Sequence, residues 1–142
     1  MSSVDGWLRI FSDVITIRLA HKQSIDHKLL AILRQLCKDG NIKIFRDPLG
    51  NPIGYAAWLC VNKESLIHIR FNLSIPPFHH EWNEGYLMVL YDVAYVPGWH
   101  KLAGDLFRDF IKSQRFVAII RRSKLKIWTR FKNKYKYLIF TN

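Results

Sequence analysis

The first third of the chain carries apolar residues at helical spacing. Between residues 5 and 19 they recur every three or four positions, which predicts an amphipathic helix. Ser24 and Asp26 are N-cap residues for a second helix, in which apolar positions run from Leu29 to Leu36. This helix is expected to end at Gly40, because glycine readily adopts the left-handed conformation of a helix C-cap.

Shorter apolar segments follow, separated by residues that favour turns. Residues 42–45 and 53–61 flank the sequence Asp-Pro-Leu-Gly-Asn-Pro, so the two segments are predicted to form a β-hairpin. In residues 65–72 apolar and polar positions alternate, which predicts a third strand. A loop with two prolines and two histidines separates this segment from the next apolar run.

The longest apolar run covers residues 86–96 and contains a single charged residue, Asp92. Because this run does not alternate, we expect a central strand that is buried on both faces. A helix over residues 101–113 and a strand over residues 116–120 follow, and the remainder has room for one or two more strands. The order predicts one α+β domain over residues 1–142, with a mixed, mostly antiparallel β-sheet flanked by helices.

Charge is concentrated toward the C-terminal end of the sequence. The 142 residues include 22 Lys and Arg and 11 Asp and Glu, which gives a net charge of +11. Ten of the basic residues and none of the acidic ones lie from Phe110 onward, so 12 basic and 11 acidic residues precede it. Such a basic segment attracts an anionic partner: a nucleic acid, an acidic protein or an anionic membrane surface.

The sequence contains no run of about 18 apolar residues of the kind that a membrane helix needs. Its first residues lack the basic and apolar pattern of a secretory signal. Cys37 and Cys60 lie in unrelated contexts, so we expect free thiols in a reducing compartment. These features predict a cytoplasmic protein without a transmembrane segment.

Two residues are separate candidates for catalytic chemistry. A carboxylate at Asp92 is costly to bury without a partner, so it serves a site, is a structural aspartate bonded to nearby backbone, or is turned to solvent by the pleat of the strand. His21, between the two predicted helices, is a natural general base near neutral pH, although capping or solvated histidines are common there. His79 and His80 have no third ligand at metal-site spacing, so no metal is predicted.

Several segments of the chain resemble a known family in the same order along the sequence. They are His21, the helix after it, the hairpin with its strand Ile-Gly-Tyr-Ala-Ala-Trp, and the apolar strand Leu-Tyr-Asp-Val-Ala-Tyr-Val-Pro-Gly. The family is the RTX toxin-activating lysine acyltransferases, and the resemblance spans His21 to Phe116, two-thirds of the chain. Two positions depart from the family pattern: Arg18 stands where a serine is usual, and Lys22 where an arginine is usual.

The resemblance implies a GNAT-like acyltransferase fold and a homodimer. It also implies transfer of a fatty acyl group from acyl-acyl carrier protein, as co-substrate without a bound cofactor, to internal lysines of an RTX-type protoxin. His21 would be the general base, with His27 as the next candidate, and Asp92 would orient the base. The resemblance leaves two routes open: direct transfer of the acyl group, and transfer through a covalent acyl-histidine intermediate.

The resemblance and the charge pattern together predict where the donor binds. Backbone N–H groups from Val93 through Tyr95 to Val96 would bind the pantetheine arm and the developing oxyanion. Gly98, just before the next predicted helix, either belongs to a turn that binds a phosphate or is an ordinary turn glycine. A basic face is expected to steer the acidic carrier protein. The residues predicted for this docking face are Arg121, Arg122, Lys124 and Lys126.

Two other classes of function compete with this prediction. A small nucleic-acid-binding protein would use the same C-terminal cations, interleaved with aromatic residues, on phosphates and bases. A GNAT-like acetyltransferase that uses coenzyme A would need more glycines than residues 96–104 contain. Both alternatives rank below the carrier-dependent acyltransferase.

Overall fold

The structure is a computed structural model that describes residues 4–22, 24–72, 74–121, 124–131 and 134–141. Side chains are described for residues 5–22, 24–72, 74–119, 125–127 and 129. The helices and strands, in chain order, are α1 (Val4–Ala20), α2 (His27–Asp39), β1 (Ile42–Arg46), β2 (Pro52–Val61), α3 (Lys63–Asn72), a 3-10 helix η1 (His79–Asn83), β3 (Leu87–Tyr95), α4 (His100–Lys112), β4 (Phe116–Arg121), β5 (Lys124–Phe131) and β6 (Lys134–Thr141).

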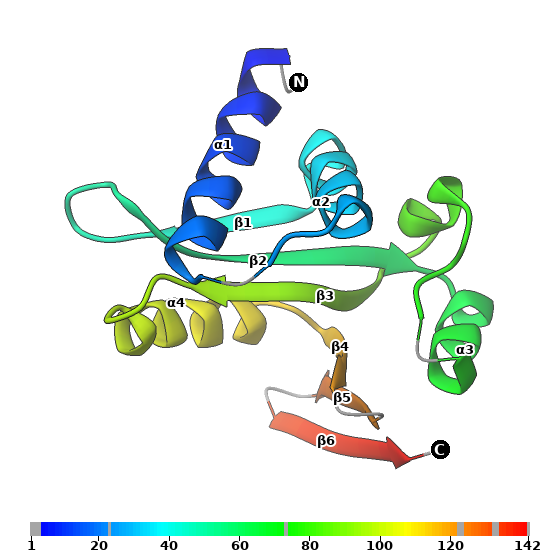
Figure 1. The fold of residues 1–142 in the computed structure, drawn as a ribbon. Coiled ribbons are helices and arrows are strands. Elements are labelled where there is room, and N and C mark those ends of the chain that lie inside the picture. Colours follow the sequence, from blue (N-terminus) through cyan, green and yellow to red (C-terminus); the bar gives the residue numbers. More distant parts are fainter. Residues whose placement is uncertain (1–3, 23, 73, 122–123, 132–133, 142) are drawn as a thin grey trace. The chain divides into compact units, whose positions relative to one another are not determined.

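The strands form one mixed sheet in the order β1-β2-β3-β4-β5-β6 (Figure 1). β1 and β2 are antiparallel, as are β4 and β5 and then β5 and β6, whereas β3 and β4 run parallel and are joined through α4. Parallel neighbours need a long crossover of this kind, because a short hairpin only joins antiparallel strands. The predicted fold class, an α+β protein with a mostly antiparallel mixed sheet flanked by helices, is confirmed, as is the interior position of β3.

The chain divides into two units, and each is described by itself. Unit 1 comprises Met1–Ala57 and Asp92–Phe110, and unit 2 comprises Trp58–Tyr91 and Ile111–Asn142. Each unit therefore combines two stretches of chain that are distant in sequence. The predicted single domain over residues 1–142 stays a prediction.

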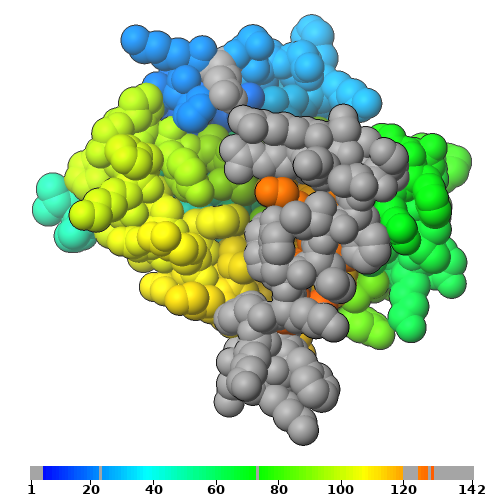
Figure 2. All heavy atoms as spheres, turned by 90° about the horizontal axis from the view of Figure 1, so that it is seen from below, coloured from blue at the N-terminus to red at the C-terminus, as the bar shows by residue number. Residues whose placement is uncertain are grey.

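In unit 1, α1 and α2 cover one face of the sheet and α4 covers the other (Figure 1). Val14 and Ile17 of α1 and Leu33 of α2 are fully buried on the first face. On the other face, the Phe45 ring meets the rings of Phe107 and Phe110 edge to face, at centroid distances of 6.2 and 6.3 Å. Figure 2 shows the outer surface of α4, in yellow.

The local signals of the sequence account for α2 and for the first hairpin. The Asp26 side chain accepts a hydrogen bond from the Leu29 N–H at 2.7 Å, and Gly40 caps the end of α2 with a φ of 78°. In the β1–β2 turn, Asp47 Oδ1 accepts from the N–H groups of Leu49 (2.9 Å) and Asn51 (2.8 Å). The predicted helix and the predicted hairpin are both confirmed. In each, a short aspartate side chain accepts hydrogen bonds from backbone N–H groups that would otherwise lack a partner.

In unit 2 the predicted strand over residues 65–72 is wrong: the segment belongs to the helix α3. Asn62 Oδ1 accepts from the Ser65 N–H at 2.8 Å, which is an N-cap contact, and Ser65 and Ile69 form a buried face at i, i+4 spacing. The apparent alternation was misleading, because Ile67 and Phe71 are 56% and 65% exposed. The loop with two histidines contains the 3-10 helix η1, where Trp82 Nε1 donates to the Pro76 carbonyl at 2.9 Å.

Candidate functional site

His21 follows the last residue of α1 and is half-buried. Its backbone N–H bonds the Ile17 carbonyl at 3.0 Å, and the chain then turns away at Lys22, which has a φ of 58°. His21 Nδ1 lies 2.7 Å from the carbonyl oxygen of Tyr95, at the end of β3. A carbonyl oxygen only accepts hydrogen bonds, so Nδ1 carries the proton and the neutral ring has its lone pair on Nε2. Nε2 is the atom that is able to take up a proton.

Asp92, on β3, is held by two side chains of unit 1 and is not joined directly to His21. Its Oδ2 accepts a hydrogen bond from the Tyr55 hydroxyl, which comes from β2. The same oxygen lies 3.5 Å from Arg18 Nη1, which comes from α1. The Arg18 side chain is 6% exposed and the Asp92 side chain 18% exposed, so this ion pair is largely shielded from water.

The structure thus brings both predicted catalytic residues to the same pair of elements, with different partners from those expected. Arg18 and His21 are three residues apart at the end of α1, and Asp92 and Tyr95 are three residues apart on β3. Two parallel contacts, Arg18 to Asp92 and His21 to Tyr95, therefore tie α1 to β3. In the described chain a backbone carbonyl, and not the Asp92 carboxylate, fixes the His21 tautomer.

Tyr55 acts as a hydrogen-bond donor at this site over the whole ordinary pH range. Its side chain is fully buried, and burial raises the pKa of its hydroxyl. The negative charge of Asp92 raises the pKa of Tyr55 further, although nearby Arg18 opposes this effect. The phenol therefore stays protonated and donates to Asp92. Sequence reasoning missed Tyr55 and noted Arg18 only as a departure; the cost of burying Asp92 was the signal that partners were needed.

Gly54 leaves the space that the Tyr95 ring occupies next to β2. A Cβ atom at Gly54 would lie 2.9 Å from Tyr95 Cδ1, 3.1 Å from the Ala94 carbonyl oxygen and 3.4 Å from Ala103 Cβ of α4. The first two distances are shorter than side chains normally tolerate. Because Gly54 has no side chain, Tyr95 packs closely against β2. This packing positions the Tyr95 carbonyl that bonds His21.

The predicted donor-binding segment continues from β3 into the turn before α4. Val93 and Tyr95 are half-buried on β3, and Gly98 is exposed with a φ of 89°. The Val96 N–H donates to the Ile53 carbonyl at 2.8 Å. Contrary to expectation, the Val96 amide is therefore engaged in the sheet and not free for a ligand. The roles of Val93, Tyr95 and Gly98 stay predictions.

The predicted docking face for the carrier lies mostly outside the described side chains. Arg121 is the last residue of β4 and Lys124 the first of β5, and their backbones are paired. Their side chains, and all of Arg122, lie outside the described part of the structure. Lys126 is described and is half-buried.

Three other histidines that were candidates for a base or a metal ligand lie on the surface. His27 is the exposed first residue of α2, and His79 and His80 are exposed in η1. His80 Nε2 lies 3.8 Å from Glu84 Oε1. Over the described residues, no cluster of three or more His, Cys, Asp or Glu side chains is arranged to hold a metal ion.

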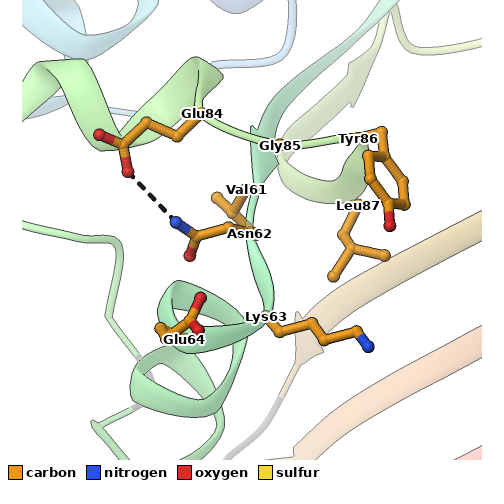
Figure 3. A pocket seen from close by; sticks show the side chains of 8 residues that line it. All are labelled: Val61, Asn62, Lys63, Glu64, Glu84, Gly85, Tyr86 and Leu87. Carbon is orange, nitrogen blue, oxygen red and sulfur yellow. Dashed lines mark hydrogen bonds between the residues drawn. The ribbon is translucent and has the colours of Figure 1, made fainter.

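Unit 2 contains a hollow of about 230 Å³ between the end of β2 and the start of β3 (Figure 3). Asn62 Nδ2 donates to Glu84 Oε2 at 3.2 Å on one side of it. None of the predicted site residues lines this hollow. Its lining residues are Val61, Asn62, Lys63, Glu64, Glu84, Gly85, Tyr86 and Leu87.

In the comparisons with known proteins, no family model matches the chain and no curated protein is significantly similar to it. Among the helices that the structure describes, none has the length and apolar character needed to cross a lipid bilayer.

Proposed function

We propose that this protein is a protein-lysine acyltransferase with His21 as its general base. The observation that carries the proposal is the hydrogen bond from His21 Nδ1 to the Tyr95 carbonyl, which leaves Nε2 as the basic atom of a half-buried ring. A histidine held in one tautomer by its other ring nitrogen is a recurrent arrangement for proton transfer. The α+β layout, in which β3 passes through α4 to the parallel strand β4, is consistent with a GNAT-like acyltransferase.

The proposed substrates follow the resemblance to the toxin-activating enzymes. The donor is a fatty acyl thioester of acyl carrier protein, and the acceptor is an internal lysine of an RTX-type protoxin. An acidic carrier suits a chain in which ten basic residues and no acidic one lie from Lys112 to Lys136. The homodimer and the cytoplasmic location belong to the same proposal.

The proposed reaction is one acyl transfer in which His21 moves one proton. A lysine ammonium, with a pKa of about 10.4, first loses a proton to solvent to become a neutral amine. The amine nitrogen attacks the thioester carbon, and Nε2 of His21 accepts the proton that the nitrogen then sheds. The C–S bond breaks, the amide forms, and the imidazolium returns its proton to the thiolate of the carrier. Asp92 does not contact His21, so in this proposal it acts indirectly, from its place three residues before Tyr95 on β3.

The test uses the purified full chain, palmitoyl-acyl carrier protein and a protoxin fragment with glycine-aspartate repeats, and follows the acylated product by intact mass. His21→Ala is expected to abolish transfer, with the native circular dichroism spectrum retained. Asp92→Ala is also expected to abolish transfer, but it leaves the buried Arg18 charge without its partner and is therefore expected to lower stability as well. His27→Ala is the matched control, because His27 is an exposed histidine of the same unit. Full activity of His21→Ala would overturn the assignment, and selective oligonucleotide binding that survives about 0.2 M salt would favour a nucleic-acid-binding protein.

A further inference from the structure

Arg18 is the one buried lysine or arginine among the described side chains. Its Nη1 faces Asp92, its Nη2 donates to the Ser24 carbonyl at 3.4 Å, and its buried Nε has no partner. A guanidinium cannot lose its charge in a protein, so burial here requires an anionic partner. Asp92 is that partner, and the position of each side chain depends on the other.

We infer that Arg18 and Tyr55 are positioning residues of the candidate site, which hold Asp92 in place and keep the His21 ring on the Tyr95 carbonyl. The catalytic meaning of this inference rests on the proposed function, whereas the tautomer of His21 is a property of the folded chain alone.

The spacing of the contacts explains how Arg18 acts on His21. Residues three apart on a helix are neighbours on one face, so Arg18 and His21 leave the last turns of α1 on the same side. The Arg18–Asp92 ion pair anchors that side of α1 to β3, one helical turn before the His21–Tyr95 hydrogen bond. Without the ion pair, the end of α1 is free to shift. The hydrogen bond from His21 Nδ1 to the Tyr95 carbonyl is then lost.

Tyr55 contributes from a third element. Its hydroxyl donates to the same Asp92 oxygen from β2, so the carboxylate is held from α1 and from β2 together. Two donors restrict the position of this oxygen more than a single donor does. Arg18 also balances the charge of Asp92, whereas the Tyr55 hydroxyl is neutral, so removing the hydroxyl alone is expected to loosen Asp92 less than removing the Arg18 charge.

The test measures the His21 tautomer in the full chain by ¹⁵N NMR of the histidine ring nitrogens, at a pH where the ring is neutral. The wild type is expected to show protonated Nδ1 and unprotonated Nε2. Arg18→Met keeps most of the apolar part of the side chain but removes its charge, and is expected to give a mixture of both tautomers. Tyr55→Phe should give a smaller shift in the same direction, and Arg18→Lys should restore part of the wild-type signal.

Arg46→Met is the matched control, because Arg46 also ties α1 to the sheet, through Asp13 at 2.7 Å, without contacting Asp92. It is expected to keep the wild-type tautomer. In the acylation assay, Tyr55→Phe is expected to lower kcat about 2- to 10-fold with little change in KM, as loss of one hydrogen bond predicts.

A pure Nδ1–H tautomer in folded Arg18→Met and in Tyr55→Phe would overturn the inference, as would an equal change in Arg46→Met. Failure of the proposed function is recognised separately. In that case acyl transfer is absent from the wild type or unaffected by His21→Ala, while the tautomer of His21 still responds to Arg18.

Discussion

Replacing Gly54 by alanine tests whether the packing around the candidate site is as close as the structure shows. The added Cβ atom would lie 2.9 Å from Tyr95 Cδ1 and 3.1 Å from the Ala94 carbonyl oxygen. Overpacking of this kind costs about 1–3 kcal/mol. Alanine restricts the unfolded chain more than glycine does, which offsets about 0.4–1 kcal/mol. The expected net loss in the free energy of unfolding is about 1–2 kcal/mol.

Urea denaturation followed by tryptophan fluorescence measures this loss, and a slope of about 2 kcal/mol/M turns it into a midpoint about 0.5–1 M lower. Gly104→Ala is the matched control, because Gly104 lies inside α4 and its added Cβ would have nothing within 4 Å. Alanine in a helix interior stabilises by about 0.5–1 kcal/mol relative to glycine, so the control should move the midpoint the other way. If Gly54→Ala were as stable as Gly104→Ala, the close approach of Tyr95 to β2 would be refuted.

Two further predictions concern Tyr55 and the basic segment. The pKa of Tyr55 is raised on folding, so its contribution to stability is complete below the ordinary tyrosine pKa of about 10 and is lost as the pH rises above it. Tyr55→Phe should therefore be less stable than the wild type at pH ~8 by about 1–3 kcal/mol, and the gap should narrow above pH ~10; a constant gap in urea titrations would contradict this. Reversing Arg121 and Arg122 to glutamate should raise KM for acyl-acyl carrier protein, more at low salt, with less effect on a small thioester donor. Equal losses with both donors would indicate a structural or catalytic role for these arginines.

The local signals of the sequence were sufficient for most of the fold. Asp26 and Gly40 delimit α2, the turn before Asn51 closes the first hairpin, and the unbroken apolar run around Asp92 marks an interior strand. These features were predictable because each depends on backbone groups and side chains only a few residues apart. The segment that contains Ile67 and Phe71 was misassigned, because a short apolar alternation does not reveal which residues become buried.

The partners of the candidate site were decided by tertiary structure. The sequence by itself determined that Asp92 would lie in a buried strand, that His21 would follow a helix, and that the C-terminal segment would be basic. Tyr55 and Arg18 are 37 and 74 residues from Asp92 in the chain, and the packing of α1 and β2 against β3 brings them together. Hydrogen bonds and ion pairs require their atoms to lie within a few ångströms of each other, so strand register and helix placement decided which residues met. The same packing made the backbone carbonyl of Tyr95 the partner of His21. Every residue has such a carbonyl, so the sequence alone did not reveal which one His21 would contact.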